Sequence, residues 1–396
     1  MADTRLTPIA GINVVADDDA LQRGGDAPSL FVRDAVNVNI TDAGKVELRP
    51  GQRHVTAIPY RNLWQSPLHR DTFGTLGDQW HKIDPEAWSS EALAAIGEGM
   101  ASHIVLMNMV CVAGPAGLFT YDGSKAQRLT LDTPAAPLVM VGEGSLDQGA
   151  YHVAVAWLRG TQESALSDAA TVHVPADGAL EVAFPMCLDM SVTGIRLYLS
   201  KPNGGELLRY EDFPVGSPVF SVRVQPTLGA AAQFRHLSPM PTGLFLAYWR
   251  GRLLTARANV LRFSEAMAYH LHDERHGFIQ MPQRITFVQP VDGGIWVGQV
   301  DHVAFLSGAS PDQLSVSRKS ARPPVPGSAM LVGSDILGGE LSQGGGDTAV
   351  WLAENGYVVG TATGQLVEPH SGVMRGISAQ SGTSVVLDRR LITAVT

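Results

Sequence analysis

Short apolar runs that end at two-residue turns recur through most of this chain, and they constrain its fold more than any other feature. Each unit reads as a strand, a turn, a second strand, a second turn and a third strand. One such turn is Asn355-Gly356, a dipeptide typical of tight hairpins. The units occupy 103–131, 243–265, 284–308 and 348–369. With 42 Gly and 24 Pro to end the runs, the sequence predicts an all-β protein.

The spacing of these units predicts a β-propeller. They recur every 40–55 residues or so, which is roughly the length of a propeller blade. No tryptophan-aspartate or kelch signature recurs, so the repeat is one of pattern and not of identity. Residues 1–133 and 234–396 would supply about six blades of roughly 40–50 residues each. Ring closure would bring the first and last strands together, with 11–15 and 384–395 as the candidate partners.

A hairpin is predicted near the N-terminus. Apolar and polar residues alternate across 36–48, on either side of an Asp42-Ala43-Gly44 turn, and Pro50-Gly51 ends the pattern. This alternation is typical of two strands with one buried face and one solvated face. No catalytic residue accompanies it.

The region 134–233 differs in style, with seven closely spaced strands expected. A Tyr-x-Val-x-Val strand (151–155) precedes a Glu-Ser segment, and the strand Gly-Ile-Arg-Leu-Tyr-Leu-Ser (194–200) precedes a glycine turn. This order resembles a fibronectin type III domain, an immunoglobulin-like β-sandwich. Under the resemblance the core would contain Tyr151, Val153, Val155, Ile195, Leu197 and Leu199. We therefore expect an inserted sandwich between two propeller parts.

Few helices are expected. Asp84-Pro85-Glu86 before the run 87–96 predicts one short helix, because Asp caps helices and Pro fits their first position. The acidic, glycine-containing segment 15–30 is expected to be an exposed loop.

The charge argues against a protein that grips nucleic acid. The formal net charge is −9, whereas binding through phosphates requires basic patches. DNA could still pass along an acidic channel without adhering. Charged residues make up 17% of the chain, which suggests that much of its surface is buried against other subunits.

We find no secretory signal and no apolar run of about 18 residues. The sequence thus predicts synthesis in a cytoplasm and no membrane insertion. Cys111 and Cys187 lie among apolar residues and are expected to be free, buried thiols.

Catalytic signatures were sought and not found. The serine-hydrolase G-x-S-x-G, the P-loop and H-E-x-x-H are absent from the sequence. The turns at 41–44 and 121–124 resemble sialidase Asp-boxes but lack their spacing. The carboxylates Glu163, Asp168, Glu211 and Asp212 are expected in solvated turns of the sandwich. The tryptophans are expected to pack in the core.

The segment 268–278 contains a histidine cluster. His270 and His272 would share one face of a strand, and Asp273 or His276 could add a third metal ligand. The simpler interpretation, which we prefer, is a loop with surface histidines. We expect no metal and no cofactor.

Two stretches resemble tail proteins of tailed bacteriophages. In the first, 12–51, a strand with the pattern Arg-x-Ala-x-Asn-Val precedes an acidic-glycine turn, and the stretch ends in Arg-Pro-Gly. In the second, 248–308, a Gly-Arg-Leu strand precedes a Leu-x-Phe-Ser-Glu strand and a strand pair that ends in Phe-Leu-Ser-Gly. The positions that carry the first match are Arg33, Ala35, Asn37, Val38, Asp42, Gly44, Arg49, Pro50 and Gly51. Those at the start of the second are Gly251, Arg252, Phe263, Ser264 and Glu265.

The resemblance implies a structural protein of the virion tail, like the nozzle of short-tailed phages. Six propeller subunits would then form a homo-hexameric ring around the channel through which double-stranded DNA leaves, without sequence-specific binding. Other tail proteins, an adaptor and fibres, would be neighbours. Two alternatives remain: a tail-tip or fibre-attachment module that recognises a host glycan or partner protein, and a propeller hydrolase that acts on surface polysaccharide. A non-enzymatic role is expected.

Overall fold

The computed structural model describes residues 8–23, 29–51, 53–217, 219–233, 236–342 and 346–396. Within these residues the regular structure is almost entirely β, as predicted. The exceptions are short turns of helix: Asp18–Ala20 and Pro311–Gln313 are 3-10 turns, and α1 (Ser334–Leu337) and α2 (Gly339–Ser342) are single α-turns. The first 3-10 turn and β2 (Gln22–Arg23) lie in the segment expected to be a loop, of which 24–28 fall outside the described residues.

Five sheets contain four antiparallel strands each, ordered almost as in the sequence. The first sheet is β6 (Arg61–Gln65), β7 (Thr72–Leu76), β8 (Gln79–Ile83) and β9 (Ser90–Ala95). The second is β10 (Ser102–Leu106), β11 (Met109–Gly114), β12 (Gly117–Tyr121) and β13 (Ala126–Arg128). The third is β23 (Leu244–Trp249), β24 (Arg252–Arg257), β25 (Val260–Phe263) and β27 (Phe278–Gln280). The fourth is β28 (Ile285–Val291), β29 (Gly294–Gln299), β30 (Val303–Ser307) and β31 (Ser315–Lys319). The fifth is β32 (Met330–Val332), β33 (Thr348–Ala353), β34 (Gly356–Gly360) and β35 (Leu366–Val367).

Tight turns with positive φ join the strands, at the positions that the sequence indicates. Between β23 and β24, Arg250 and Gly251 have φ of 46° and 79°. Gly356, in the Asn-Gly turn before β34, has φ of 100°. Such turns follow the right-handed twist of the flanking strands and so allow each sheet to fold from one continuous stretch of chain.

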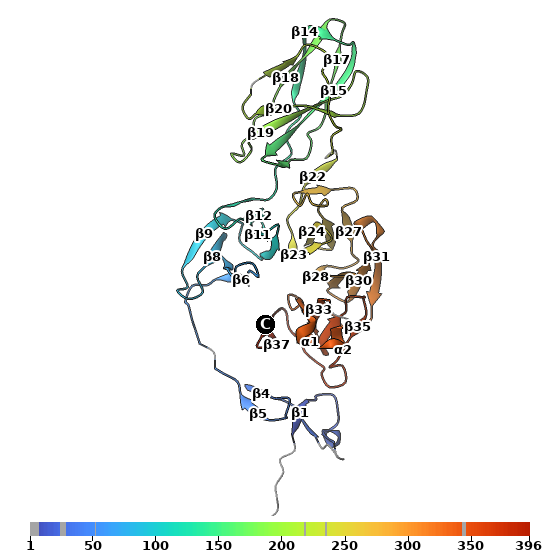
Figure 1. Cartoon of the computed structure of the whole chain (residues 1–396). Helices are drawn as coiled ribbons and strands as arrows, with labels where there is room; N and C mark the ends of the chain where they lie inside the picture. The colour runs from blue at the N-terminus through green and yellow to red at the C-terminus, as the bar shows by residue number, and fades with distance from the viewer. Residues whose placement is uncertain (1–7, 24–28, 52, 218, 234–235, 343–345) are drawn as a thin grey trace, which may run out of the picture.

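Hydrophobic clusters join each of these sheets to the next. Phe73 and Trp80 of the first sheet pack with Val112 of the second, and Trp296 of the fourth packs on Trp351 of the fifth with ring centroids 5.6 Å apart. Gly360 allows this contact, because a Cβ there would lie 2.5 Å from the Trp296 ring. Equivalent clusters link the second sheet to the third and the third to the fourth. The five sheets follow one another along a curve (Figure 1).

One hairpin precedes this series in the sequence and another follows it. The C-terminal hairpin, β36 (Gly382–Leu387) and β37 (Arg390–Val395), packs Val386 and Leu391 on the fifth sheet. The N-terminal hairpin is β4 (Val38–Ile40) and β5 (Val46–Leu48), beside a small sheet of β1 (Ile9–Ile12), β3 (Ser29–Val32) and β2.

The expected pairing of 11–15 with 384–395 is wrong. β1 pairs in parallel with β3, and β36 pairs with β37. The Val14 amide instead donates to the Val373 carbonyl, which lies beyond the fifth sheet, at 2.8 Å. β3, which the sequence patterns did not predict, pairs with the edge of β1 that was expected to pair with the C-terminal strand.

Residues 138–222 form two sheets around one core, at the end of the molecule opposite to β1–β5 (Figure 1). One sheet contains β14 (Leu138–Leu146), β18 (Gly178–Ala183) and β21 (Val219–Val222). The other contains β15 (Gly149–Arg159), β16 (Gln162–Glu163), β17 (Ala170–Val174), β19 (Gly194–Leu199) and β20 (Leu208–Pro214). These are eight strands where seven were expected. The six predicted core residues are all buried: Tyr151, Val153, Val155, Ile195, Leu197 and Leu199. We call this region the sandwich.

The helix predicted at 87–96 is wrong. The Asp84 carboxylate does accept bonds from the Glu86 and Ala87 amides, at 2.9 and 3.3 Å, but they close a turn. The chain then enters β9, whose Ala94 pairs with Trp80 of β8. The unsatisfied edge of β8 outweighs the helix propensity of an alanine-rich run.

Candidate functional site

A cavity of about 860 Å³ lies where the second, third and fourth sheets and the C-terminal hairpin approach one another. Its lining comes from the same end of each sheet, at the start of one strand and the end of the next. Leu244 and Phe245 of β23 and Thr286 of β28 contribute, and Gly382 of β36 lies across from them. The cavity thus depends on the arrangement of several sheets and belongs to no single one.

The charged side chains that line this cavity are Arg257 and Arg284. An acidic wall was expected for a channel through which DNA slides; no observation identifies this cavity with such a channel, so that expectation stays a prediction. Two guanidinium groups without a lining carboxylate offer no acid–base pair for hydrolysis. They would attract anions and phosphate groups.

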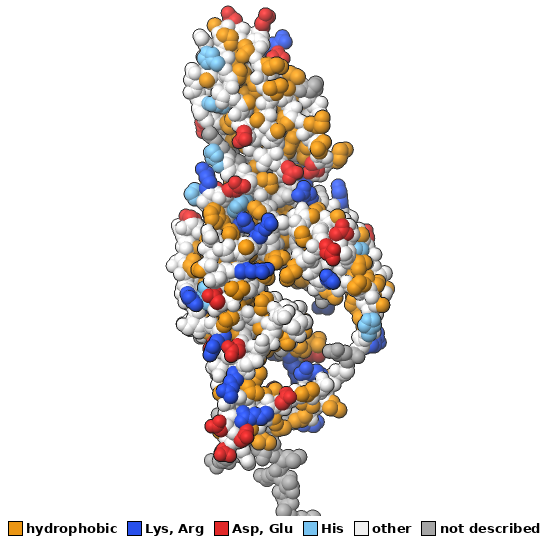
Figure 2. Space-filling view, turned by 180° about the vertical axis from the view of Figure 1, so that it is seen from behind, with side chains coloured by type: hydrophobic (Ala, Val, Ile, Leu, Met, Phe, Trp, Pro, Cys, Tyr) orange, Lys and Arg blue, Asp and Glu red, His pale blue; other side chains and the backbone are white. Residues whose placement is uncertain are grey.

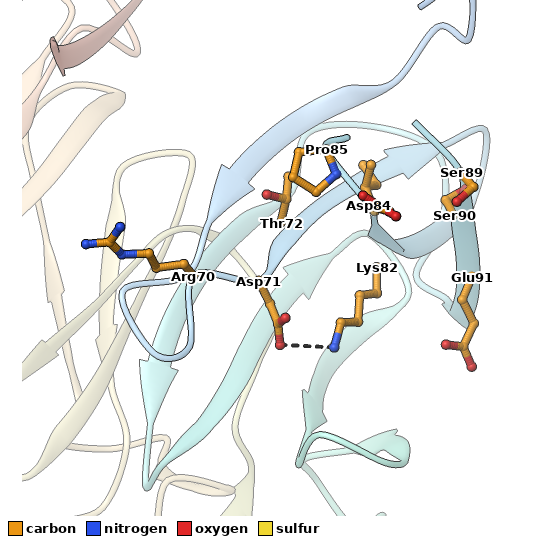
Figure 3. Close-up of a pocket in the computed structure, with 10 residues that line it drawn as sticks. Arg70, Asp71, Thr72, Lys82, Asp84, Pro85, Ser89, Ser90 and Glu91 are labelled. Atoms are coloured by element: carbon orange, nitrogen blue, oxygen red, sulfur yellow. Dashed lines mark ion pairs between the residues drawn. The ribbon is translucent and has the colours of Figure 1, made fainter. Parts of the chain in front are cut away.

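A second, polar pocket of about 530 Å³ lies on the first sheet. Its Lys82 ammonium pairs with the Asp71 carboxylate at 3.1 Å, and Glu91 lies on the far side of Lys82 (Figure 3). The Asp84 carboxylate is taken by the turn described above. The Ser90 hydroxyl, which also lines the pocket, lies 3.0 Å from the His81 Nδ1, so a serine–histidine contact stands beside the surface ion pair and the turn.

The most connected polar group lies between the sandwich and the third sheet. The buried Glu163 carboxylate binds the Arg196 guanidinium and the Tyr198 hydroxyl, both at 2.5 Å. Arg196 also makes a bidentate contact with Asp212, which lowers the pKa of that carboxyl. On the other side, the His270 Nε2 donates to the Glu163 carbonyl oxygen at 2.8 Å. We call these five residues the junction.

The junction corrects two expectations. Glu163 was expected in a solvated turn, yet it is buried in β16. Glu211 and Asp212 are exposed but lie on the strand β20 and not in a turn, whereas Asp168 is exposed outside the strands, as expected. Burial also raises the pKa of the Tyr198 hydroxyl, so this proton stays on the oxygen. Through the Glu163 carbonyl, the group joins the sandwich to His270.

The preferred interpretation of the histidine cluster is also wrong in part. His270 and His272 are buried, and the His272 Nδ1 bonds to the Phe263 carbonyl at 3.0 Å. His272 lies on β26 (Leu271–Asp273), which pairs with β22 (Leu237–Pro239), and His270 immediately precedes that strand. Burial lowers the pKa of both rings, which favours the neutral form. Among the described residues no group of three or more His, Cys, Asp or Glu could hold a metal ion.

Most of the tryptophans are buried, as expected, with Trp64 and Trp88 half-buried. Both cysteines are free; Cys111 is buried, and burial raises the pKa of its thiol to about 12, while Cys187 is only half-buried. No helix in the described part of the chain is long and apolar enough to cross a membrane.

The N-terminal motif positions have structural contacts. Arg33 pairs with Asp18 at 2.6 Å, and the Asn37 carbonyl accepts from the Arg49 amide. Gly44 has φ of 75°, and a Cβ there would lie 2.4 Å from Pro8. Asp42 lies in the turn before it. Pro50 and Gly51 are exposed and follow β5.

The second motif group converges at one end of the third sheet. Ser264 is fully buried, and its hydroxyl accepts from the Leu253 amide and donates to the Glu265 carbonyl, each at 2.9 Å. Arg252 donates to the Ser264 carbonyl at 2.7 Å, and the Gly251 carbonyl accepts from Met267. Phe263 is buried beside them. The structure does not bring this group together with the N-terminal one, and each closes a turn in its own sheet.

No protein-family model and no curated protein matches this chain. Solved structures similar to parts of it include a computationally designed protein, Ika8, with a TM-score of 0.26, 12% identity and coverage of 85% of this chain and 93% of that one. Another is the extracellular domain of a putative one-component system from B. thetaiotaomicron, with a TM-score of 0.22, 11% identity and coverage of 86% and 57%. The CNH domain of AfRom2 has a TM-score of 0.19, 8% identity and coverage of 76% and 93%. Scores this low establish no shared fold.

Proposed function

We propose that this protein is a structural component of a bacteriophage tail, a subunit of a nozzle-like ring that lines or closes the DNA-exit channel. The observation that carries the proposal is the series of five four-stranded sheets that ends in two-stranded hairpins. A series that is unfinished at its ends suits a subunit that is completed by its neighbours. The motif positions shared with tail proteins close turns in this series and perform no chemistry.

The architecture that we propose is a β-propeller of about six blades at 1–133 and 234–396, with a fibronectin type III-like sandwich inserted at 134–233. The hydrophobic clusters between successive sheets and the single core of the sandwich support this architecture. The junction ties the sandwich to the segment around His270, which follows β25 of the third sheet. In the ring, copies of the chain would form a hexamer, with adaptor and fibre proteins as neighbours. Arg257 and Arg284 would face the DNA phosphates weakly and without sequence preference.

Antibody–gold labelling of virions whose genome encodes this chain tests the proposal. Gold is expected at the tail end, and averaging of labelled particles should give the number of copies. Particles without label would overturn it, provided that the antibody detects the chain in the same particles after denaturation.

A binding module is the second candidate, and the sandwich favours it. Met186, Leu188 and Met190 lie strongly exposed on the loop between β18 and β19. Figure 2 shows exposed hydrophobic side chains along the sandwich, a surface that fits a partner protein better than a glycan. If this is the main role, Leu188→Glu should abolish attachment of the partner to the virion and leave the tail assembled.

A further inference from the structure

The C-terminal hairpin exposes an apolar face. One face, with Val386 and Leu391, packs on the fifth sheet. The register pairs Val385 with Ile392 on the opposite face, and Leu387 follows Val385 on that face. All three are exposed, Ile392 by 41%. In the middle of the series such a face would pack on the next sheet.

The N-terminal hairpin also has an apolar face that is partly exposed. Its register pairs Val38 with Leu48 and Ile40 with Val46, so these four apolar side chains share one face. The sequence predicts that this face is buried. Instead Leu48 is 85% exposed and Val46 is exposed too.

The two hairpins do not meet within one chain. The Gly44 carbonyl accepts from the Ile9 amide, and the Val14 amide donates to Val373, so the N-terminal hairpin is tied to the far end of the fifth sheet. Ile40 of the N-terminal hairpin and Arg390, which lies at the tip of the C-terminal hairpin, both line a cavity of about 520 Å³. No ladder joins the hairpins in the described residues. In Figure 1 β4 and β5 lie apart from β37.

We propose that the N-terminal hairpin of one copy of this chain adds to the outer edge of β37 in a second copy, where the Leu391 carbonyl would exchange its bond from the Tyr357 hydroxyl (3.4 Å) for one from the added strand. Two strands from each copy complete a four-stranded sheet, the size of the five complete ones. Charges of both signs can pair across the contact, because Asp388 and Arg390 lie at the tip of one hairpin and Asp42 and Lys45 at the turn of the other, all exposed. The contact joins different surfaces of identical copies, so it is head-to-tail and propagates into a ring.

The proposal rests on the ring in the proposed function and names the surfaces that join its subunits. Sedimentation equilibrium of the full chain tests it with two variants, Leu48→Glu and Ile392→Glu. Both residues are exposed, so the subunit should keep its circular dichroism spectrum and melting temperature. Each variant should sediment as a monomer, with association weakened about tenfold or more. Leu188→Glu is the matched control, because Leu188 is also 85% exposed but lies on the sandwich. It should assemble like the parent.

Mixing the two variants gives the decisive readout. The Leu48→Glu copy keeps an intact β36–β37 hairpin, and the Ile392→Glu copy keeps an intact β4–β5 hairpin. One good interface then remains, so the mixture should form a dimer and nothing larger. Variants that assemble like the parent would overturn the inference and leave the ring itself intact. A parent that stays monomeric at all concentrations, or a mixture that gives no dimer, would also overturn it. The location of the gold label in virions judges the tail proposal separately.

Discussion

The sandwich and the series of five sheets differ in how completely each buries its own apolar residues. In the sandwich, residues from both sheets enclose one core, with Val153 and Leu180 among those fully buried. In the series, each cluster lies between two sheets, so every sheet needs a neighbour on both sides. Among the residues that the structure describes, the C-terminal hairpin has a sheet neighbour on one side only, and the first sheet shares a cluster only with the second.

The number of strands therefore does not decide whether a region buries all of its own apolar surface. A sandwich pairs its two apolar faces internally, whereas a series of sheets has one unpaired face at each end unless it closes. The exposed side chains on the terminal hairpins follow from this geometry. They lie where a single chain has no further sheet to cover them.

The largest expected effect is that of Trp296→Ala, which should destabilise the sheet series and leave the stability of the sandwich unchanged. Trp296 is fully buried between the fourth and fifth sheets, and its Nε1 donates to the Thr361 carbonyl at 2.9 Å. Truncation should cost about 3–5 kcal/mol of unfolding free energy. In scanning calorimetry the transition of the sheet series should move to lower temperature while that of the sandwich stays. Equal shifts in both would show that the regions unfold as one unit.

Arg196→Met should weaken the junction by about 3 kcal/mol, because it leaves the buried Glu163 carboxylate without its cation. Urea unfolding of the full chain measures the loss. Arg209→Met is the matched control: Arg209 contacts only the more exposed Asp212, so its removal should cost about 0.5 kcal/mol or less. Equal losses would contradict the assignment of Glu163 as the centre of the junction.

The sheet series should lose stability on acidification. His103 accepts a hydrogen bond from Trp80 Nε1 at 3.1 Å and stacks on Trp64, and burial lowers its pKa to about 4. An unfolded chain has a histidine pKa of about 6.5, so below that pH it binds more protons than the folded chain. Stability should therefore be constant above this value and fall as the pH drops from about 6.5 to about 4. His103→Gln keeps an acceptor and should reduce the slope, as measured by urea midpoints at several pH values. An unchanged slope would exclude His103 as its source.

The smallest effect is predicted for Val385→Ala, at the open end of the series. Its side chain is exposed in the single chain, so truncation should change monomer stability by no more than about 0.5 kcal/mol. Val350→Ala, in the buried face of β33, is the comparison and should cost clearly more. Comparable losses in the monomer would mean that Val385 is covered within its own chain.

The strand units and their turns could be predicted because period-2 patterns and glycine turns are local signals, as at Arg250-Gly251 and Asn355-Gly356. The sandwich core could be predicted for the same reason. The strand β9 could not, because its pairing with the neighbouring β8 overrides a local helix signal. The burial of Glu163 and His270 could not, because it depends on residues distant in sequence that meet at the junction. Nothing in the local pattern at 163 distinguishes a buried carboxylate from a solvated one.

Cryo-electron microscopy of the purified full chain at assembling concentrations would show which surfaces join neighbouring subunits. We expect closed rings in which β4–β5 of each subunit continues the β36–β37 sheet of the next, with the sandwiches making no sheet with a neighbour. Rings joined through the sandwiches, or single chains in which β4–β5 closes onto its own β37, would contradict it.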